Sequence, residues 1–163
     1  MERSVTSMFS RAAWLLIVVV LMLVNLANFA TIYLTASRQG GLLRLSESLL
    51  EGVCHRMPSR SFWISEIPLG LCSRCTGIYL SAFITMLFVA SPVRGRLPGN
   101  THLLLALLLP LVADALLEHF GVYTGSNTIR FVTGFLFGYA LVRLLGRLLQ
   151  LTTPLTHIER TPP

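Results

Sequence analysis

Residues 12–34 form a run without a charged side chain, and this run limits what the first part of the chain can fold into. A helix needs about 20 consecutive apolar residues to cross the hydrocarbon core of a bilayer. The alternative is a cleaved signal peptide, whose apolar region is usually only about 7–15 residues long. The run also lacks a small-x-small cleavage site, because Ala27 and Ala30 have the wrong spacing. We therefore predict a membrane helix over residues 12–34.

The composition places the whole chain in the same class. Hydrophobic residues make up 53% of the 163 residues and charged residues 12%, and the mean hydropathy is +0.69. Soluble domains carry about 25% charged residues. A soluble protein of this length could not bury so much apolar surface. We therefore predict an all-α membrane protein with a single membrane domain over residues 1–151, whose first partner is the lipid bilayer.

Three more apolar stretches follow the first. The four predicted transmembrane helices are residues 12–34, 76–91, 101–118 and 129–149. Pro110 should kink the third helix, which membrane helices tolerate when neighbours satisfy the freed carbonyl. Small residues four apart on the second and fourth helices should let these two pack closely. These small residues are Gly77, Ser81, Thr85, Gly134 and Gly138.

Residues 38–52 change to an amphipathic pattern. Leu42, Leu45 and Leu49 recur at helical spacing, with charged residues between them. Such a pattern predicts an amphipathic helix that lies in the membrane interface. A linker helix packed on the bundle is an equal alternative. In either case this helix leads the chain to Cys54.

The arginines indicate how the helices are oriented. The net charge is +6, carried by 13 arginines and no lysine. Four spans put the N-terminus, a turn predicted at residues 92–100 and a tail over residues 152–163, expected to be disordered, on one side. Arg94 and Arg96 lie in that short turn, where the positive-inside rule gives them most weight. We expect a multi-pass protein of the cell (inner or plasma) membrane with cytoplasmic termini and the loop of residues 54–75 outside.

This loop contains all three cysteines of the chain. Cys72 and Cys75 form C-x-x-C, and Cys54 lies upstream beside His55. Two thiolates at this spacing can hold a metal ion, as in zinc knuckles, or form a redox-active disulfide. We predict a zinc site formed by Cys54, His55, Cys72 and Cys75. Three other residues compete with His55 for the fourth position: Asp114, Glu118 and His119. Copper(I) and iron remain open, as does the alternative of three small buried hydrophobic residues.

Four spans also bring polar residues of the later helices to the same membrane face. Asp114 and Glu118 lie four residues apart near the end of the third helix, and Arg130 lies at the start of the fourth. Ionisable residues near the bilayer are costly and tend to be functional, so these three are the candidate catalytic residues. The alternative is structural pairing of the carboxylates with nearby arginines. Those arginines are Arg56, Arg60, Arg74 and Arg130.

A longer signature runs through the loop and the later helices. It consists of Cys54-His55, Pro58, Arg60-Ser61-Phe62, Cys72-x-Arg74-Cys75-Thr76-Gly77-Ile78-Tyr79, Asp114 and Ser126-Asn127-x-x-Arg130-x-x-Thr133-Gly134. Over residues 54–139 the chain resembles domain-of-unknown-function family 2085, small predicted membrane proteins of bacteria and archaea. It departs from that pattern at Ala115 and Glu118, where the resemblance leads us to expect glycine and glutamine, and in a longer spacing between Pro68 and Cys72. The resemblance implies the membrane bundle and the Cys/His site but no activity, because none is established for the family.

Three hypotheses on function remain after the sequence has been considered. The first is a membrane protein with a zinc site at one membrane face, next to the pocket of Asp114, Glu118 and Arg130. The second is a membrane thiol–disulfide oxidoreductase that uses Cys72 and Cys75. The third is a small transporter or lipid-binding module that uses Asp114 and Glu118. Nucleic-acid binding is not predicted, because the arginines are scattered and lack interleaved aromatic residues. Whether the chain is an enzyme, forms a homo-oligomer or binds a membrane partner stays open.

Overall fold

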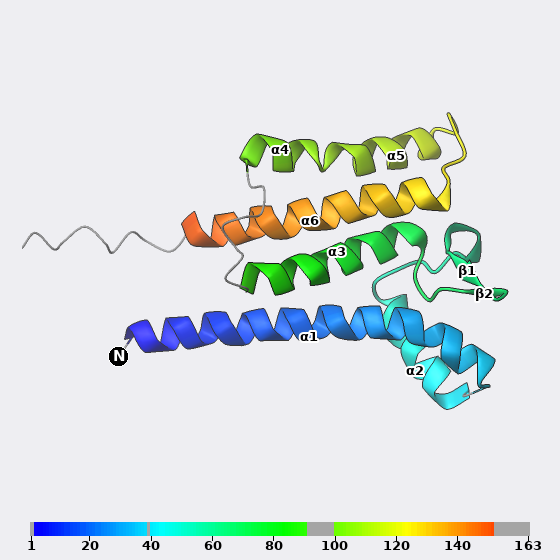
Figure 1. The fold of residues 1–163 in the computed structure, drawn as a ribbon, viewed down its shortest axis with the longest axis horizontal. Coiled ribbons are helices and arrows are strands. Elements are labelled where there is room, and N and C mark those ends of the chain that lie inside the picture. The colour runs from blue at the N-terminus through cyan, green and yellow to red at the C-terminus, as the bar shows by residue number, and fades with distance from the viewer. Residues whose placement is uncertain (1, 39, 91–99, 152–163) are drawn as a thin grey trace, which may run out of the picture.

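The computed structural model describes residues 2–38, 40–90 and 100–151 (Figure 1). These residues are mostly helical, as predicted. The helices are α1 (Glu2–Ala36), α2 (Gly40–Glu51), α3 (Ser73–Ala90), α4 (Thr101–Ala106), α5 (Leu109–His119) and α6 (Asn127–Leu151). The turn predicted at residues 92–100 lies, except for Asn100, outside the described residues, and so does the tail of residues 152–163.

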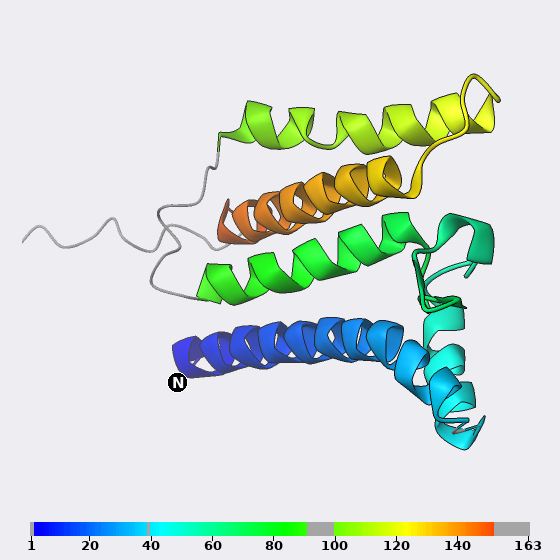
Figure 2. The ribbon, with the colours of Figure 1, turned by 45° about the vertical axis from the view of Figure 1, so that its right-hand side comes forward.

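Four helical layers run side by side along one direction (Figures 1 and 2). Helix α3 lies between α1 and α6, and α4 and α5 together form the layer on the other side of α6. Helix α2 lies across one end of the bundle, packed on α1. The loop that carries the cysteines covers the same end, where α3 and α6 begin and α5 stops.

Three helical segments are long and apolar enough to cross a membrane. They are Ala12–Ala36, Thr101–His119 and Asn127–Leu148. The second predicted span corresponds to α3, of which the shorter segment Ser73–Phe88 is apolar. A mostly helical protein with three candidate membrane-spanning segments is therefore confirmed, and the fourth predicted span is not.

The loop between α2 and α3 contains a small sheet that the sequence did not predict. Strands β1 (Trp63–Ile64) and β2 (Ile67–Pro68) pair antiparallel, with Ile64 opposite Ile67. The turn between them uses Ser65 and Glu66, both with positive φ, at 49° and 66°. Two-residue hairpin turns of this hand usually contain glycine or asparagine. Because neither is present, the local sequence carries no hairpin signal.

Pro110 interrupts the third predicted span, as expected. Helix α4 ends at Ala106, and α5 begins at Leu109 with Pro110 in its first turn. Proline has no N–H to donate, and its ring clashes with the carbonyl four residues earlier. The helix therefore stops about one turn before the proline and restarts at Leu109, directly before it.

Helices α3 and α6 approach closely through small residues, which confirms that prediction. A Cβ atom on Gly77 would lie 2.9 Å from the backbone nitrogen of Phe135. A Cβ atom on Gly134 would lie 3.2 Å from the carbonyl carbon of Arg74 and would overlap its oxygen. Backbone meets backbone at these points, so only glycine fits.

Helix α2 packs on the bundle, which is one of the two alternatives left open by its pattern. Leu50 is fully buried and packs in a cluster with Ala27 of α1, Cys54 and Leu71. Leu42, Leu45 and Leu49 form an exposed row on another face, each with more than half of its surface open, at 55%, 59% and 55%. The helix is thus packed on the bundle and presents leucines outward, as an interfacial helix does.

The tight α3–α6 contact predicts that alanine substitutions at two glycines of α6 will affect the stability of the fold very differently. We expect Gly134→Ala to destabilise the fold by about 1–3 kcal/mol, because the added methyl group overlaps the backbone of α3. Gly146→Ala is the matched control, since a Cβ atom there meets nothing within 4 Å. Thermal unfolding in detergent, followed by circular dichroism, measures both. Equal midpoints for the two variants would contradict the close approach.

Candidate metal centre

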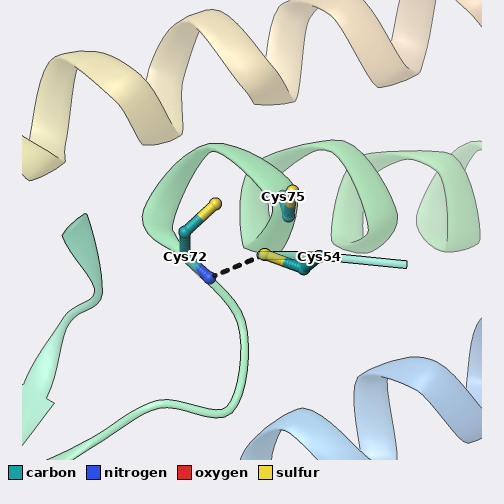
Figure 3. A group of neighbouring side chains, drawn as sticks. All are labelled: Cys54, Cys72 and Cys75. Carbon is teal, nitrogen blue, oxygen red and sulfur yellow. Dashed lines mark hydrogen bonds between the residues drawn. The ribbon is translucent and has the colours of Figure 1, made fainter. Parts of the chain in front are cut away.

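The three cysteines lie together at the end of the bundle covered by α2. Their Sγ atoms all lie within 4.8 Å of one another (Figure 3). Cys54 is buried, Cys72 and Cys75 are half-buried, and all three are free thiols. The predicted grouping of C-x-x-C with the upstream cysteine is therefore present in the fold.

Two elements bring the sulfurs together. Cys72 directly precedes α3 and Cys75 lies in its first turn, so their spacing of three residues puts both side chains on one face of the helix. Cys54 follows α2, whose buried Leu50 fixes the end of that helix against α1. The chain then turns sharply at Arg56, which has a φ of 48°. The site thus joins the α1–α2 pair to the start of α3.

The sulfur of Cys54 is surrounded by donors. It accepts hydrogen bonds from the backbone N–H groups of Arg56 and Cys72, both at 3.4 Å; Figure 3 shows the bond from Cys72. The nearby thiols of Cys72 and Cys75, in that order, together with these N–H groups, lower the pKa of the Cys54 thiol far below its ordinary value. The same contact with Cys54 raises the pKa of Cys72. The arrangement favours a thiolate at Cys54, which is the form that binds metals.

His55 does not belong to this cluster. The ligand atoms that lie within 4.8 Å of one another are the three sulfurs, and the His55 side chain is exposed. His119, a rival for the fourth position, is also exposed and stacks edge-on against Phe120, with ring centroids 5.5 Å apart. Asp114 and Glu118 are engaged elsewhere, as described below.

A cavity of about 370 Å³ adjoins the cysteines. Its lining consists of Val53, Cys54, His55, Arg56, Met57, Arg60, Cys72, Arg74 and Cys75. The three arginines come from three different segments: the loop after α2, the 3₁₀ turn Pro58–Arg60 and the first turn of α3. The cavity is therefore bordered by sulfur on one part of its wall and by guanidinium groups on another.

Behind this cavity, two carboxylates of α5 are paired with arginines. Glu118 contacts Arg130 at 2.7 Å, Arg60 at 3.0 Å and Arg74 at 3.1 Å. Asp114 contacts Arg74 and accepts a hydrogen bond from the hydroxyl of Tyr123. That bond raises the pKa of Tyr123, because a deprotonated phenol would face the carboxylate. The side chain of Asp114 is only 3% exposed and that of Glu118 only 11%.

These ion pairs confirm that the end of the third predicted span, the cysteine segment and the start of the fourth converge. Arg74 lies in the first turn of α3, Glu118 in the last turn of α5 and Arg130 in the first turn of α6. Arg56, which was also a possible partner, pairs instead with Glu47 of α2 at 2.8 Å and lies 3.6 Å from Glu51. The network of Arg60, Arg74, Arg130, Asp114 and Glu118 contains three positive and two negative charges, which leaves one positive charge in excess.

Sequence reasoning missed the asparagines of α1. The side-chain oxygen of Asn28 accepts the N–H of Leu71 at 2.7 Å, and its amide donates to Thr76 at 3.3 Å. Asn25 donates to the carbonyl of Tyr79 at 3.1 Å. Both asparagines are buried. Their presence in an otherwise apolar span was the available signal, since such residues link helices inside membranes.

The family model described as predicted membrane protein, domain of unknown function 2085, matches residues 54–144. The chain belongs to this family. An uncharacterized protein of Methanocaldococcus jannaschii is 33% identical over 93 residues, which cover 55% of this chain and 59% of that protein. An uncharacterized protein of Methanothermobacter thermautotrophicus is 37% identical over 93 residues, covering 56% of this chain and 83% of that protein. No solved structure matches.

The match to family 2085 coincides with the site. It begins at Cys54 and includes all three cysteines, α3, α5 and the network around Glu118. Helices α1 and α2 precede the matched region. Within this chain they supply Asn28, which holds the loop, and Glu47, which pairs with Arg56.

The buried ion pairs predict that removing the charge of Asp114 destabilises the fold more than removing its hydrogen bond with Tyr123. We expect Asp114→Asn to cost about 3 kcal/mol or more, because the charge of Arg74 loses a buried partner. Tyr123→Phe should cost only about 1 kcal/mol, since it removes one neutral hydrogen bond. Glu66→Gln, at the exposed hairpin turn, should change stability by less than about 0.5 kcal/mol. Denaturation in mixed detergent micelles measures all three, and an Asp114→Asn protein as stable as the Glu66→Gln control would contradict the pairing.

Proposed function

We propose that this chain is a four-span membrane protein that binds one zinc ion through Cys54, Cys72 and Cys75 at one membrane face. The observation that carries the proposal is the grouping of the three sulfurs within 4.8 Å. A tetrahedral zinc site has Zn–S distances of about 2.3 Å, which puts its sulfurs about 3.8 Å apart. Small side-chain rotations would therefore close the site around the ion. Thiolate-rich ligation favours zinc, with copper(I) and iron as the other candidates.

The groups around the cysteines support a metal thiolate centre. Backbone N–H groups that donate to Cys54 stabilise a charged sulfur, as outer-shell hydrogen bonds do at metal sites. Three thiolates with one divalent ion carry a net charge of −1. The arginine–carboxylate network beside them has an excess of one positive charge. The nearby positive charge favours thiolates at the edge of the bilayer, where an unpaired charge is costly.

The proposal differs from the predicted ligand set at the fourth coordination position. His55 is adjacent to Cys54, and neighbouring residues rarely point at one ion. Its side chain is exposed and outside the sulfur cluster. We therefore assign three protein ligands and leave the fourth position facing the cavity, as catalytic zinc sites do.

The length and position of α3 support the proposal that it also crosses the membrane, as the second of the four predicted transmembrane helices. Its 18 residues reach about 27 Å at the helical rise of about 1.5 Å per residue, close to the hydrocarbon thickness of about 30 Å. It lies between α1 and α6, both of which are long enough to span (Figure 2). With four spans the cysteine end lies at one membrane face. The arginines of the turn at residues 92–100 favour cytoplasmic termini and an outward-facing site.

Elemental analysis of detergent-purified protein, prepared without chelator or reductant, tests the zinc site. We expect about one zinc per chain, lost in Cys72→Ser and in Cys75→Ser, because two thiolates hold the ion too weakly. His55→Ala is the matched comparison and should keep the zinc. Loss of zinc in His55→Ala would make His55 the fourth ligand. Absence of metal from the wild-type protein would overturn the proposal.

A second candidate, the thiol–disulfide oxidoreductase, is favoured by one observation. All three thiols are free and close, so Cys72 and Cys75 could form a disulfide as they reduce a disulfide of a partner to two thiols. This function would require Cys72 and Cys75 to cycle with a partner that supplies the second cysteine pair. Thiol counting on the same preparation separates the two functions. Two oxidised thiols without metal would favour the oxidoreductase, and zinc with three unreactive thiols would exclude it.

A further inference from the structure

The cavity beside the cysteines has an unusual polar lining. Among the described residues that line it, three are arginines, one is a histidine and none is an aspartate or glutamate. The carboxylates that pair with these arginines are not among the lining residues: Asp114 and Glu118 on α5, and Glu47 and Glu51 on α2. Among the described lining residues, the cavity therefore presents guanidinium donors, and its only side-chain acceptors are sulfur atoms and one ring nitrogen of a neutral His55.

Several of these donors are unused. A guanidinium group has five N–H donors and no acceptor. Arg60 contacts Glu118 through Nη2, and Arg74 uses its Nη2 for both Asp114 and Glu118. The Nε atom of Arg74 is buried and has no hydrogen-bond partner among the described residues. A buried donor without a partner costs free energy, so a ligand or solvent molecule rich in acceptors fits this wall.

The start of α3 adds to this potential. The helix begins at Ser73 and runs for 18 residues, so its unpaired N–H groups and positive dipole end lie next to Cys72. Helix N-termini favour anions for this reason. Two features thus meet at one cavity: arginines from three segments, and the N-terminus of α3, where Arg74 has a buried donor without a partner among the described residues.

We propose that this cavity binds a phosphate group, held by Arg60 and Arg74 beside the metal. The guanidinium fork matches the oxygens of phosphate or carboxylate. A phosphate presents more oxygens than a planar carboxylate, so arginines from different segments can share it. The cavity volume of about 370 Å³ leaves room for more than one water molecule, each of which occupies about 30 Å³ in the liquid. The placement beside a metal rests on the proposed zinc site, whereas binding by the arginines does not.

The phosphate has two sources that fit this chemistry: a free phosphate ion or phosphate monoester, and the headgroup of a phospholipid. The exposed leucine row of α2, Leu42, Leu45 and Leu49, lies at the same end of the bundle and would contact acyl chains. Separate titrations with each kind of ligand distinguish the two sources by their affinities.

Isothermal titration on detergent-purified protein in phosphate-free buffer is the experiment. The probes are inorganic phosphate, the soluble short-chain lipid dihexanoyl phosphatidic acid, and malonate as a carboxylate control. Zinc content is measured on the same samples. We expect saturable binding of about one phosphate group per chain, weakened at least about tenfold in Arg60→Gln, because a charge-assisted hydrogen bond is lost. Arg44→Gln, on the exposed face of α2 outside the cavity lining, is the matched control and should bind normally.

Each outcome decides the proposal. Tighter binding of the lipid assigns the site to a headgroup, and similar binding of both probes assigns it to free phosphate or a monoester. Zinc-containing protein that binds neither probe, or binds malonate alone, overturns the phosphate site and leaves the zinc site standing. Zinc-free protein that binds phosphate in an Arg60-dependent way supports the phosphate site and overturns the metal. Equal weakening by Arg60→Gln and Arg44→Gln would show surface attraction only and overturn the site.

Discussion

The close approach of α3 and α6 is the contact on which the rest of the structure depends. Apolar side chains gain little by meeting each other in lipid, so helices in a membrane associate through close packing and polar pairs. Gly77 and Gly134 let the two backbones touch near the start of both helices. The side chains of Arg74 and Arg130, which flank this point, are thereby brought to the same carboxylate, Glu118. The glycines thus position the charges, and the charges in turn hold α5.

Glu118 connects four parts of the chain through one side chain. It lies at the end of α5 and contacts arginines from the 3₁₀ turn, from α3 and from α6. Because it is only 11% exposed, removing any one partner leaves a poorly solvated charge. The network therefore specifies how α5 and the cysteine loop sit on the α3–α6 pair more than it adds stability. Its excess positive charge lies beside the three cysteines, which links the network to the chemistry proposed for them.

The sequence was sufficient to predict the order of the helices and the end of the bundle at which the polar residues gather. It was not sufficient to predict the individual ion pairs and hydrogen bonds. Convergence of Cys54, Cys75, Glu118 and Arg130 follows from topology, because alternate helix ends share one side. Arg56 could have paired with Glu118 on that basis, yet it binds Glu47, because α2 folds back across the bundle end. The contact of Asn28 with Leu71 joins residues 43 positions apart and leaves no local pattern. The Ser65–Glu66 hairpin turn likewise lacks the residues that usually reveal such a turn.

The contacts of the cysteine loop bear on what a metal would do there. Protein groups already fix this loop at several points: Asn28 binds the N–H of Leu71, the buried hydroxyl of Ser73 donates to the carbonyl of Arg60 at 2.8 Å, and Asn127 donates to that of Ser61 at 2.9 Å. A structural zinc site usually supplies the folding energy that its small domain lacks. Here helix packing and side-chain hydrogen bonds hold the loop in which Cys54 and Cys72 lie. A metal held by these thiols, as proposed above, would face the cavity lined by arginines and would be open to a ligand there.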